Sequence, residues 1–295
     1  MGDRQVIFIV GVARSGTSAL ARVLSLCGCT LPQGLKEGDP GNPTGYWESL
    51  EVERLLNEFF RAHHTNYTDP TLCLQEELSF SQQEREHYIG QIGDFLSRCP
   101  LGSQLLIKDP RIVTQFDFWL QAARARDFSA KVIVAVRHPM EVAASLAEFG
   151  TRVTIPASLE LCQAMWLKYN LLSERYSRGV PRVFTEYSTL LEDWRLQVAR
   201  IAHALGLDLA TDSAAEIDAF LTPDLHRQKH AGPIAESFGH SWMSDTYTIL
   251  AQAARDKTPD VARLDEIFEA YRTCERAFRV SLDDWRRRLP ARVPA

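Results

Sequence analysis

The sequence predicts an α/β fold in which a mainly parallel sheet is flanked by helices on both faces, with a helical C-terminal tail. Short, continuous apolar runs recur along the chain, as is typical of strands buried on both faces. Stretches with the hydrophobic period of a helix separate these runs, and strands that alternate with helices assemble into a parallel sheet. The 295 residues, 45% hydrophobic and 24% charged, have the composition of a globular protein with a sizeable core.

The first expected strand and helix enclose a loop that contains glycine. Residues 6–10 form the apolar run Val-Ile-Phe-Ile-Val, which Gly11 stops. Residues 17–27 have apolar side chains at helical spacing, and Gly28 is a natural stop for that helix. The following stretch, 32–45, is rich in glycine and proline, so we expect it to be irregular.

The remaining elements continue this alternation. A capping-box pattern, Ser81 with Glu84, marks the start of a helix that runs toward Arg98. Apolar runs predict three further strands, at 104–107, 131–136 and 182–185. Helices are expected at 48–63, between the second and third strands, from Pro139 onward, at 158–178, at 189–205 and at 258–289.

The C-terminal helix carries an apolar stripe that we expect to pack on the rest of the protein. Its members are Leu264, Ile267, Phe268, Tyr271 and Phe278. We therefore predict a single domain over residues 1–295, with a core of about 1–228 and a C-terminal helical region of about 229–295.

Composition excludes several classes of protein. The formal net charge of −5 argues against a general nucleic-acid binder, which is usually basic. No stretch approaches the ~20 apolar residues that span a membrane, and the first residues lack the pattern of a signal peptide, so we expect a cytosolic protein. The six cysteines form no C-x-x-C pair, which favours free, buried or half-buried thiols over a zinc site or disulfides.

Residues 11–18, Gly-Val-Ala-Arg-Ser-Gly-Thr-Ser, have the form of a phosphate-binding loop. Its two glycines let successive backbone N–H groups point inward, and the helix that follows adds its positive N-terminal end. The nucleotide-binding pattern G-x-x-x-x-G-K-S/T has lysine where this chain has Thr17. A tight turn between strand and helix would also use glycine, but the cation of Arg14 and the hydroxyl groups of Ser15, Thr17 and Ser18 favour an anion site.

Three polar segments are expected at one edge of the sheet. Residues 11–18 follow the first strand, 108–111 (Lys-Asp-Pro-Arg) the second and 137–139 (Arg-His-Pro) the third, and parallel sheets bind ligands at the carboxyl ends of their strands. A magnesium-dependent ATP or GTP site needs an acidic residue at such an end. Asp109 is the one acidic residue among these cations, so the edge favours an anion bound without a metal and weakens the kinase or NTPase interpretation.

Two of these segments, in this order, resemble the sulfotransferase family: Ala-Arg-Ser-Gly-Thr-Ser at 13–18, then R-x-P at 137–139 with a serine at Ser145. The resemblance spans about residues 6–206 and implies a P-loop-type fold. It implies that Arg14, Ser15, Gly16, Thr17 and Ser18 bind the 5′-phosphosulfate of 3′-phosphoadenosine-5′-phosphosulfate (PAPS). It also implies that Arg137 and Ser145 bind the 3′-phosphate. Arg14 stands where many members have lysine.

Further segments are similar to bacterial sulfotransferases in particular. Residues 42–48 and 108–111 look like segments of those proteins. Residues 184–190 resemble the family's Y-E-D-L segment without its acidic pair, and the resemblance places Tyr187 near the adenine. Residues 220–227 have a faint similarity to a late segment, from which Arg227 or Lys229 would close over the donor or lie exposed.

The resemblance also implies the chemistry. An acceptor oxygen attacks sulfur, and the negative charge that grows on the leaving oxygen needs a cation nearby. Arg14 is the candidate for that cation, and Lys108 the candidate for stabilising the sulfuryl oxygens.

A general base must take the proton of the acceptor. Cytosolic members with phenol or steroid acceptors use the histidine of a K-T-H motif, but residues 108–110 here are Lys-Asp-Pro. Glu48 fits the order of the glutamate in carbohydrate and protein-tyrosine sulfotransferases, and Glu37 and Asp109 are the other candidates. Glu48 could instead be an acid at a helix start, and Asp109 could bind Lys108, Arg111 or a backbone N–H.

We therefore expect a metal-independent sulfotransferase that transfers the sulfuryl group of PAPS to an acceptor hydroxyl and leaves adenosine 3′,5′-bisphosphate (PAP). The acceptor would be a small molecule or glycan, and the glutamate favours a carbohydrate or glycolipid. Two alternatives stay open: a small-molecule kinase that uses Mg-ATP, and a non-catalytic nucleotide-binding protein. The sequence specifies neither the acceptor nor the oligomeric state, and 65–80 and 229–250 contain no recognisable pattern.

Overall fold

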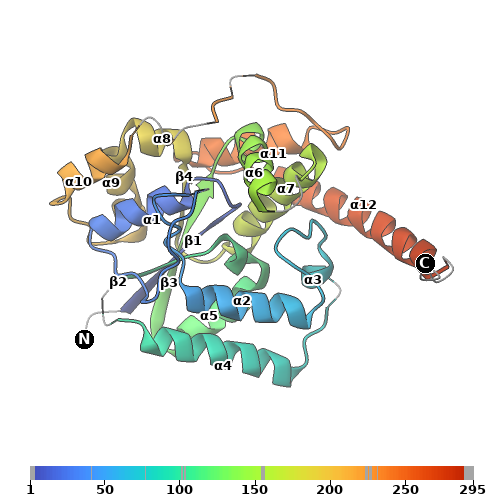
Figure 1. The fold of residues 1–295 in the computed structure, drawn as a ribbon, viewed down its shortest axis with the longest axis horizontal. Helices are drawn as coiled ribbons and strands as arrows, with labels where there is room; N and C mark the ends of the chain where they lie inside the picture. Colours follow the sequence, from blue (N-terminus) through green and yellow to red (C-terminus); the bar gives the residue numbers. More distant parts are fainter. Residues whose placement is uncertain are drawn as a thin grey trace.

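The computed structural model describes residues 4–40, 42–76, 78–100, 102, 104–153, 157–222, 225, 228–230 and 232–288. At its centre lies a sheet of four parallel strands in the order β2-β1-β3-β4 (Figure 1). The strands are β1 (Arg4–Gly11), β2 (Gln104–Lys108), β3 (Phe128–Val136) and β4 (Arg182–Glu186). The predicted α/β class with a parallel sheet is confirmed.

The register of the strands brings their carboxyl ends to one edge. Ile9 of β1 lies beside Lys108 of β2, and Gly11 lies beside Ala135 of β3. The loops that follow β2 and β3 therefore each start one strand spacing from the loop that follows β1, at the same edge of the sheet, as the sequence predicted.

Helices cover both faces of this sheet. The helical segments are α1 (Thr17–Leu26), α2 (Leu50–Ala62), α3 (Cys73–Glu76), α4 (Gln82–Arg98), the 3-10 turn η1 (Pro110–Gln115), α5 (Phe116–Ala125), α6 (Pro139–Val153), α7 (Leu159–Tyr176), α8 (Tyr187–Glu192), α9 (Trp194–Leu205), α10 (Ala214–Phe220), α11 (Trp242–Ala253) and α12 (Val261–Arg288). Alternate side chains of β1 divide the core: Ile7 and Ile9 pack with α1, α8, α9 and α10, whereas Phe8 packs with α2, α4, α5 and α7.

Several predicted boundaries are confirmed and two are corrected. The capping box at Ser81 and Glu84 is present at the start of α4. The third strand begins at Phe128 rather than at residue 131. The single helix expected at 189–205 is two helices, because Asp193 leaves the helical conformation (φ −150°, ψ 86°) and its side chain caps the next helix at the Leu196 N–H.

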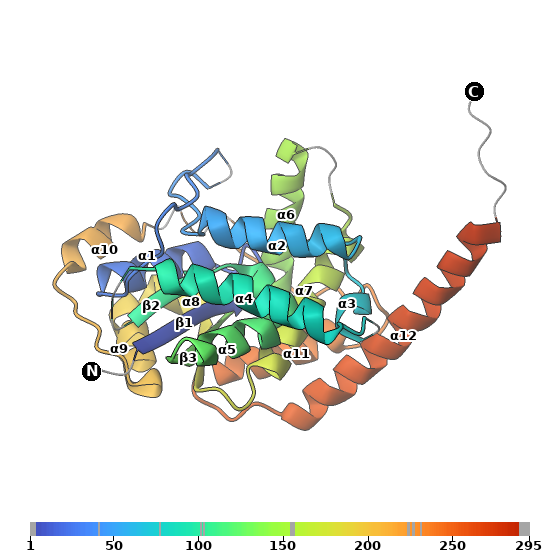
Figure 2. The same ribbon diagram turned by 90° about the horizontal axis from the view of Figure 1, so that it is seen from below.

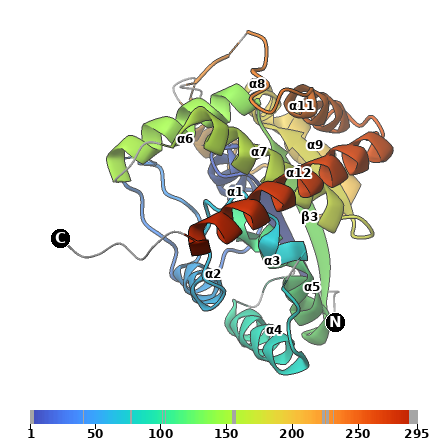
Figure 3. The same cartoon turned by 90° about the vertical axis from the view of Figure 1, so that its right-hand side faces the viewer.

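The stripe of the C-terminal helix is only partly buried. Leu264, Ile267, Phe268 and Tyr271 pack on the body, but the expected burial of Phe278 is wrong, since 74% of that side chain is exposed. Figures 1 and 2 show the reason: α12 continues beyond the body of the protein, so its last turns lie away from the other described residues. In Figure 3, which looks from that side, α12 crosses in front of the body. Within the described residues, every helix is too short or too polar to span a membrane.

The cysteines are free thiols, as predicted. Cys27, Cys29, Cys99 and Cys162 are buried and Cys73 is half-buried. Cys274 departs from the prediction because it is exposed on α12, close to the point where that helix leaves the body.

Candidate active site

A cavity of about 360 Å³ opens at the carboxyl ends of β1, β2 and β3. Its wall includes Arg14, Gly16, Thr17, Ser18, Lys36, Asn42, Tyr46, Glu48, Glu53, Tyr67, Lys108, Arg111, Arg137, Ser145, Glu148, Tyr187, Leu225 and Gln228. Loops from three strand ends therefore meet at one cavity. The irregular segment before α2 and the segment after α10, with Leu225 and Gln228, complete its wall.

The loop between β1 and α1 takes a conformation that glycine and one strained residue make possible. Gly16 has φ 79°, and a Cβ there would lie 2.0 Å from Cδ2 of Tyr187. Arg14 also has a positive φ, 70°, which is uncommon for a residue with a side chain and recurs at functional sites. Because Gly16 immediately precedes α1, the N-terminal end of that helix faces the cavity at Thr17.

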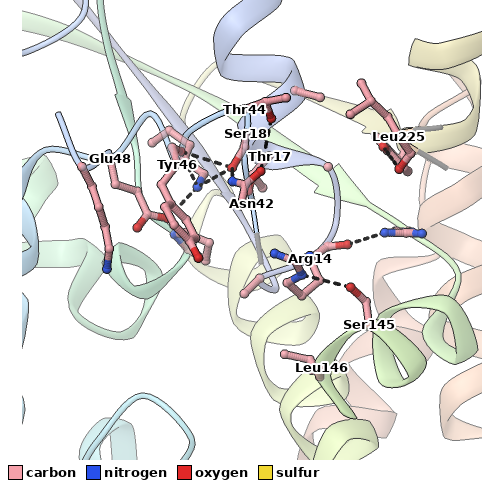
Figure 4. A pocket seen from close by; sticks show the side chains of 18 of the residues that line it. Arg14, Thr17, Ser18, Asn42, Thr44, Tyr46, Glu48, Ser145, Leu146 and Leu225 are labelled. Carbon is pink, nitrogen blue, oxygen red and sulfur yellow. Dashed lines mark hydrogen bonds and ion pairs between the residues drawn. The ribbon is translucent and has the colours of Figure 1, made fainter. Parts of the chain in front are cut away.

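The side chain of Arg14 joins this loop to α6. Its Nε donates a hydrogen bond to Oγ of Ser145 (2.9 Å), while its backbone carbonyl accepts one from Arg137 (2.9 Å). Figure 4 shows Arg14 reaching across from the loop to Ser145. The loop residue and the two residues of the R-x-P…S segment, predicted separately, are therefore in direct contact.

Arg137 is buried and held from several sides. Its Nε donates to Glu141 (2.8 Å) one helical turn later, and a terminal nitrogen donates to the carbonyl of Gln228 (3.1 Å). Its guanidinium lies 4.7 Å from the ring centre of Tyr187, whose hydroxyl donates to the carbonyl of Leu225 (2.8 Å). These contacts fix a cation beside an aromatic ring on the cavity wall.

A buried ion pair lies elsewhere on the wall, where Figure 4 draws Glu48 and Tyr46 away from Ser145. Lys108 Nζ is 2.5 Å from a carboxylate oxygen of Glu48 and also donates to Ser18 Oγ (3.1 Å) and the carbonyl of Tyr46 (3.0 Å). Burial raises the pKa of Glu48, and the ammonium of Lys108 opposes part of that rise. Glu48 precedes α2, which begins at Leu50 behind the cap of Ser49, so it is not an acid of the first helical turn.

Asp109 is fully buried, and its carboxylate binds Arg111, two residues along the same segment. One carboxylate oxygen accepts hydrogen bonds from the backbone N–H and Nε of Arg111 (3.0 and 2.8 Å), and the other accepts one from NH2 of Arg111 (2.6 Å). This clamp sets the guanidinium of Arg111 on the cavity wall, 3.9 Å from Glu48 and 3.7 Å from Glu53.

A family model described as the sulfotransferase family matches residues 6–212, which is more than half of the chain. The chain belongs to the sulfotransferase family. It is therefore a transferase whose reaction is the movement of a sulfuryl group. No curated protein matches it.

Solved sulfotransferase structures also resemble this one. The sulfotransferase domain of the Synechococcus PCC 7002 olefin synthase is 17% identical, with 85% of this chain and 96% of that chain covered and a TM-score of 0.52. Sulfotransferase STF9 from Mycobacterium avium is 14% identical over 92% of this chain and 76% of that chain (TM-score 0.47). Mouse SULT7A1, solved with PAP, is 15% identical over 89% and 88% (TM-score 0.42). The first of these shows that the fold is shared.

The cavity of this sulfotransferase contains most of the residues that the sequence singled out. Those on its wall are Arg14, Gly16, Thr17, Ser18, Glu48, Lys108, Arg137, Ser145 and Tyr187. Ser15 is buried within the loop and Asp109 is buried beneath Arg111, and neither is on the wall. Glu37 and Lys229 are exposed and off the wall, and Arg227 lies outside the described residues.

The sequence missed other residues of the wall. Tyr46 lies within the segment 42–48, whose similarity to bacterial sulfotransferases was a usable signal. Lys36, Glu53 and Tyr67 come from an irregular loop, the first turns of α2 and the stretch before α3. No short motif marks these three positions, because only the packing of distant segments brings them together.

Proposed function

We propose that this sulfotransferase transfers the sulfuryl group of PAPS to a hydroxyl of an acceptor and releases PAP. One observation carries the proposal: a single cavity contains both the Arg14, Ser145 and Arg137 cluster and the Glu48–Lys108 pair. The first group offers cations and donors to the phosphates, and the second offers a base beside a cation.

The donor would bind along the loop and α6. Backbone N–H groups of residues 13–18 and the N-terminal end of α1 suit the 5′-phosphosulfate, with hydroxyl groups from Thr17 and Ser18 on the wall. Arg137 and Ser145 suit the 3′-phosphate, and the ring of Tyr187 would lie beside the adenine. Ser15 lies inside the loop and would offer its backbone N–H to the 5′-phosphosulfate, whereas its buried side chain is off the wall.

The acceptor oxygen would attack sulfur as the bond between sulfur and the bridging phosphate oxygen breaks. Glu48 takes the acceptor's proton, and its raised pKa suits a group that must accept one. Lys108 stabilises the sulfuryl oxygens, and Arg14 neutralises the charge that grows on the leaving oxygen. These cations supply the positive charge that magnesium supplies in many phosphoryl transfers, so we propose that no metal is required.

Asp109 is assigned a supporting role in place of base chemistry. Its oxygens are used by Arg111, whose guanidinium faces Glu48. Removal of Asp109 would release that guanidinium and change the charge around the base.

The acceptor side of the cavity supports a hydroxyl-rich acceptor, such as a carbohydrate or the sugar of a glycolipid. Tyr46 and Tyr67 offer aromatic rings, and the Lys36–Glu53 pair (2.8 Å) offers hydrogen-bonding groups beside them. Aromatic faces bordered by charged side chains suit the two kinds of surface of a sugar ring.

Calorimetry with PAP and with Mg-ATP tests the donor assignment on the full chain. We expect PAP to bind with or without magnesium and Mg-ATP to bind far more weakly. Tight Mg-ATP binding without PAP binding would favour the kinase alternative. Transfer from radiolabelled PAPS to methyl glycosides, a glycolipid and 4-nitrophenol then tests the acceptor class. PAP binding without transfer to any of them would favour the non-catalytic alternative.

Two broader expectations remain predictions for this protein. A single domain over residues 1–295 predicts one cooperative unfolding transition, in which the region after 228 does not melt separately. A cytoplasmic location predicts recovery in the cytosolic fraction of lysed cells.

A further inference from the structure

Tyr67 enters the cavity wall from the stretch between α2 and α3, where the sequence contains no motif. Its hydroxyl is buried. Burial raises the pKa of Tyr67, and the guanidinium of Arg111 opposes part of that rise. Tyr67 shares the cavity wall with Ala13 of the phosphate loop and with the neighbouring Glu48 and Arg111.

Side chains of two helices that are distant in the sequence, α7 and α12, form hydrogen bonds with the backbone of the stretch 67–72. Tyr169 Oη donates to Tyr67 O (3.0 Å), Lys168 Nζ to Asp69 O (2.9 Å), Tyr271 Oη to Pro70 O (2.5 Å), and the Leu72 N–H to Glu275 Oε1 (2.7 Å). The first two side chains belong to α7 and the last two to α12. Each bond satisfies a backbone group of an irregular segment, so each restricts where Tyr67 can lie.

The bonds from α12 join parts of the chain about two hundred residues apart. Tyr271 is the last buried residue of α12, and Glu275 follows it by one helical turn. Tyr271 is buried, and the side chain of Glu275 is 9% exposed. Hydrogen bonds from buried side chains to a loop are lost at a net cost when either partner is removed.

We propose that Tyr67 shapes the place of the acceptor oxygen, and that Tyr271 and Glu275 of α12 are positioning residues that hold Tyr67 there. The proposal rests on the proposed function, because it needs an acceptor oxygen next to Glu48. The C-terminal helix α12 would then affect the reaction through the position of Tyr67, without contacting donor or acceptor itself. When the hold is released, the wall at Tyr67 opens and water reaches the space reserved for the acceptor.

The hold by α12 is tested in the full chain with four variants. Tyr271→Phe removes one hydroxyl from α12 and keeps the ring. Glu275→Ala removes the acceptor for Leu72, whereas Glu275→Gln keeps an oxygen that can accept that bond. Thr273→Ala is the matched control, because its exposed hydroxyl bonds to Glu269 O of α12 itself (2.8 Å) and to no other described residue.

Hydrogen exchange of the backbone amides of residues 67–72 measures directly how firmly α12 holds this stretch. We expect the amides of 67–72 to exchange about tenfold faster in Tyr271→Phe and Glu275→Ala, as the loss of one hydrogen bond of about 1.4 kcal/mol implies. Glu275→Gln should restore most of the protection, and Thr273→Ala should match the wild type. Unchanged exchange in Tyr271→Phe and Glu275→Ala would overturn the hold by α12.

Cleavage of PAPS with water as the acceptor measures how far water enters the acceptor space. This assay needs no known acceptor. We expect it to rise several-fold in Tyr67→Ala and in Tyr271→Phe, with the dissociation constant of PAP within about twofold of wild type. The double variant Tyr67→Ala/Tyr271→Phe should equal Tyr67→Ala alone, because Tyr271 acts through Tyr67.

Three results would overturn the role of Tyr67. They are unchanged cleavage in Tyr67→Ala, additive effects in the double variant, and a loss of PAP affinity as large as the change in cleavage. Failure of the proposed function has a different signature: the wild type itself would not bind PAP, while the exchange data would still report whether α12 holds the loop.

Discussion

The two sides of the cavity are built in different ways. On the side proposed for the donor, Arg14, Arg137 and Ser145 lie in or just after loops that begin at the ends of adjacent parallel strands. On the acceptor side, Tyr46 and Tyr67 come from irregular segments, and the latter is held by helices up to two hundred residues away. The donor side therefore follows from local sequence and sheet topology, whereas the acceptor side depends on long-range packing.

This difference indicates how the protein can change. A strand-to-helix loop with a positive-φ glycine tolerates few alternatives, so a substitution there should affect donor binding and stability together. Irregular segments that are held by side chains can vary one contact at a time. Substitutions on the two sides should accordingly separate donor affinity from turnover.

The largest effect is expected at Glu48, where the two sides meet. Glu48→Gln removes the proposed base and keeps the size of the side chain. Turnover should fall by about 10²- to 10⁴-fold, the usual contribution of general acid–base catalysis, while PAP affinity stays close to wild type. Transfer from PAPS under saturating donor, with calorimetry of PAP, measures both.

Glu51→Gln is the matched control for Glu48→Gln. Glu51 occupies the first turn of α2 and pairs with Arg98 on the surface, so its loss reports only the effect of an acid at a helix start. Turnover in Glu51→Gln should remain near wild type. Equal losses in the two variants would mean that Glu48 acts through the helix and not as a base.

The pH dependence of turnover sharpens the same assignment. A general base works only when it is deprotonated, and burial raises the pKa of Glu48. Turnover should therefore fall on acidification at a higher pH than an ordinary glutamate would require, and the fall should be absent from the residual rate of Glu48→Gln. An acid limb that persists unchanged in that variant would assign it to another group.

A smaller effect, confined to the donor side, is expected at Arg137. Arg137→Ala removes the cation proposed for the 3′-phosphate. Hydrogen bonds to charged groups contribute about 1.5–3 kcal/mol, so PAP should bind about 10- to 100-fold more weakly. Adenosine 5′-phosphosulfate, which lacks the 3′-phosphate, should lose little affinity by the same calorimetric measurement.

Two control variants test whether the effect of Arg137→Ala on PAP affinity has a purely structural cause. Arg137→Lys keeps a positive charge next to Glu141 and should recover part of the affinity. Arg182→Ala breaks another arginine–glutamate pair, with Glu174 at 2.9 Å, away from the cavity, and should leave PAP binding unchanged. If PAP and adenosine 5′-phosphosulfate lose affinity equally in Arg137→Ala, Arg137 does not bind the 3′-phosphate.

Gly179, between α7 and β4, is a matched control for Gly16 of the phosphate loop. Gly16 and Gly179 share φ 79°, but only at Gly16 would a Cβ meet a neighbour, Tyr187. Gly179→Ala should cost about 1–2 kcal/mol of unfolding free energy for the left-handed conformation alone. Gly16→Ala should cost more and weaken PAP binding, because Tyr187 or the loop must move. Urea unfolding and calorimetry measure the two effects, and equal costs would show that the contact with Tyr187 does not constrain the loop.

The donor side was predictable from sequence because its determinants are local. A buried strand, a glycine at positive φ and a helix start lie within the first 27 residues, and parallel pairing brings the ends of β2 and β3 beside them. Tyr67 was not predictable, since Pro70 meets Tyr271 only after α12 has packed on α7. Asp193 was missed for another reason: a capping side chain broke a helix whose hydrophobic period continues through it.

The smallest effect is expected at the end of α12, where sequence and structure differ. Phe268 and Phe278 belong to one stripe of the sequence, but Phe268 is 2% exposed and Phe278 is 74% exposed. Phe268→Ala should lower the unfolding free energy by about 3–5 kcal/mol, because it leaves a cavity beside α7. Phe278→Ala should change it by less than about 0.5 kcal/mol, as is usual for an exposed side chain. A large loss from Phe278→Ala in urea unfolding would show that the end of α12 is covered in solution, and the hold on residues 67–72 would then extend beyond Tyr271 and Glu275.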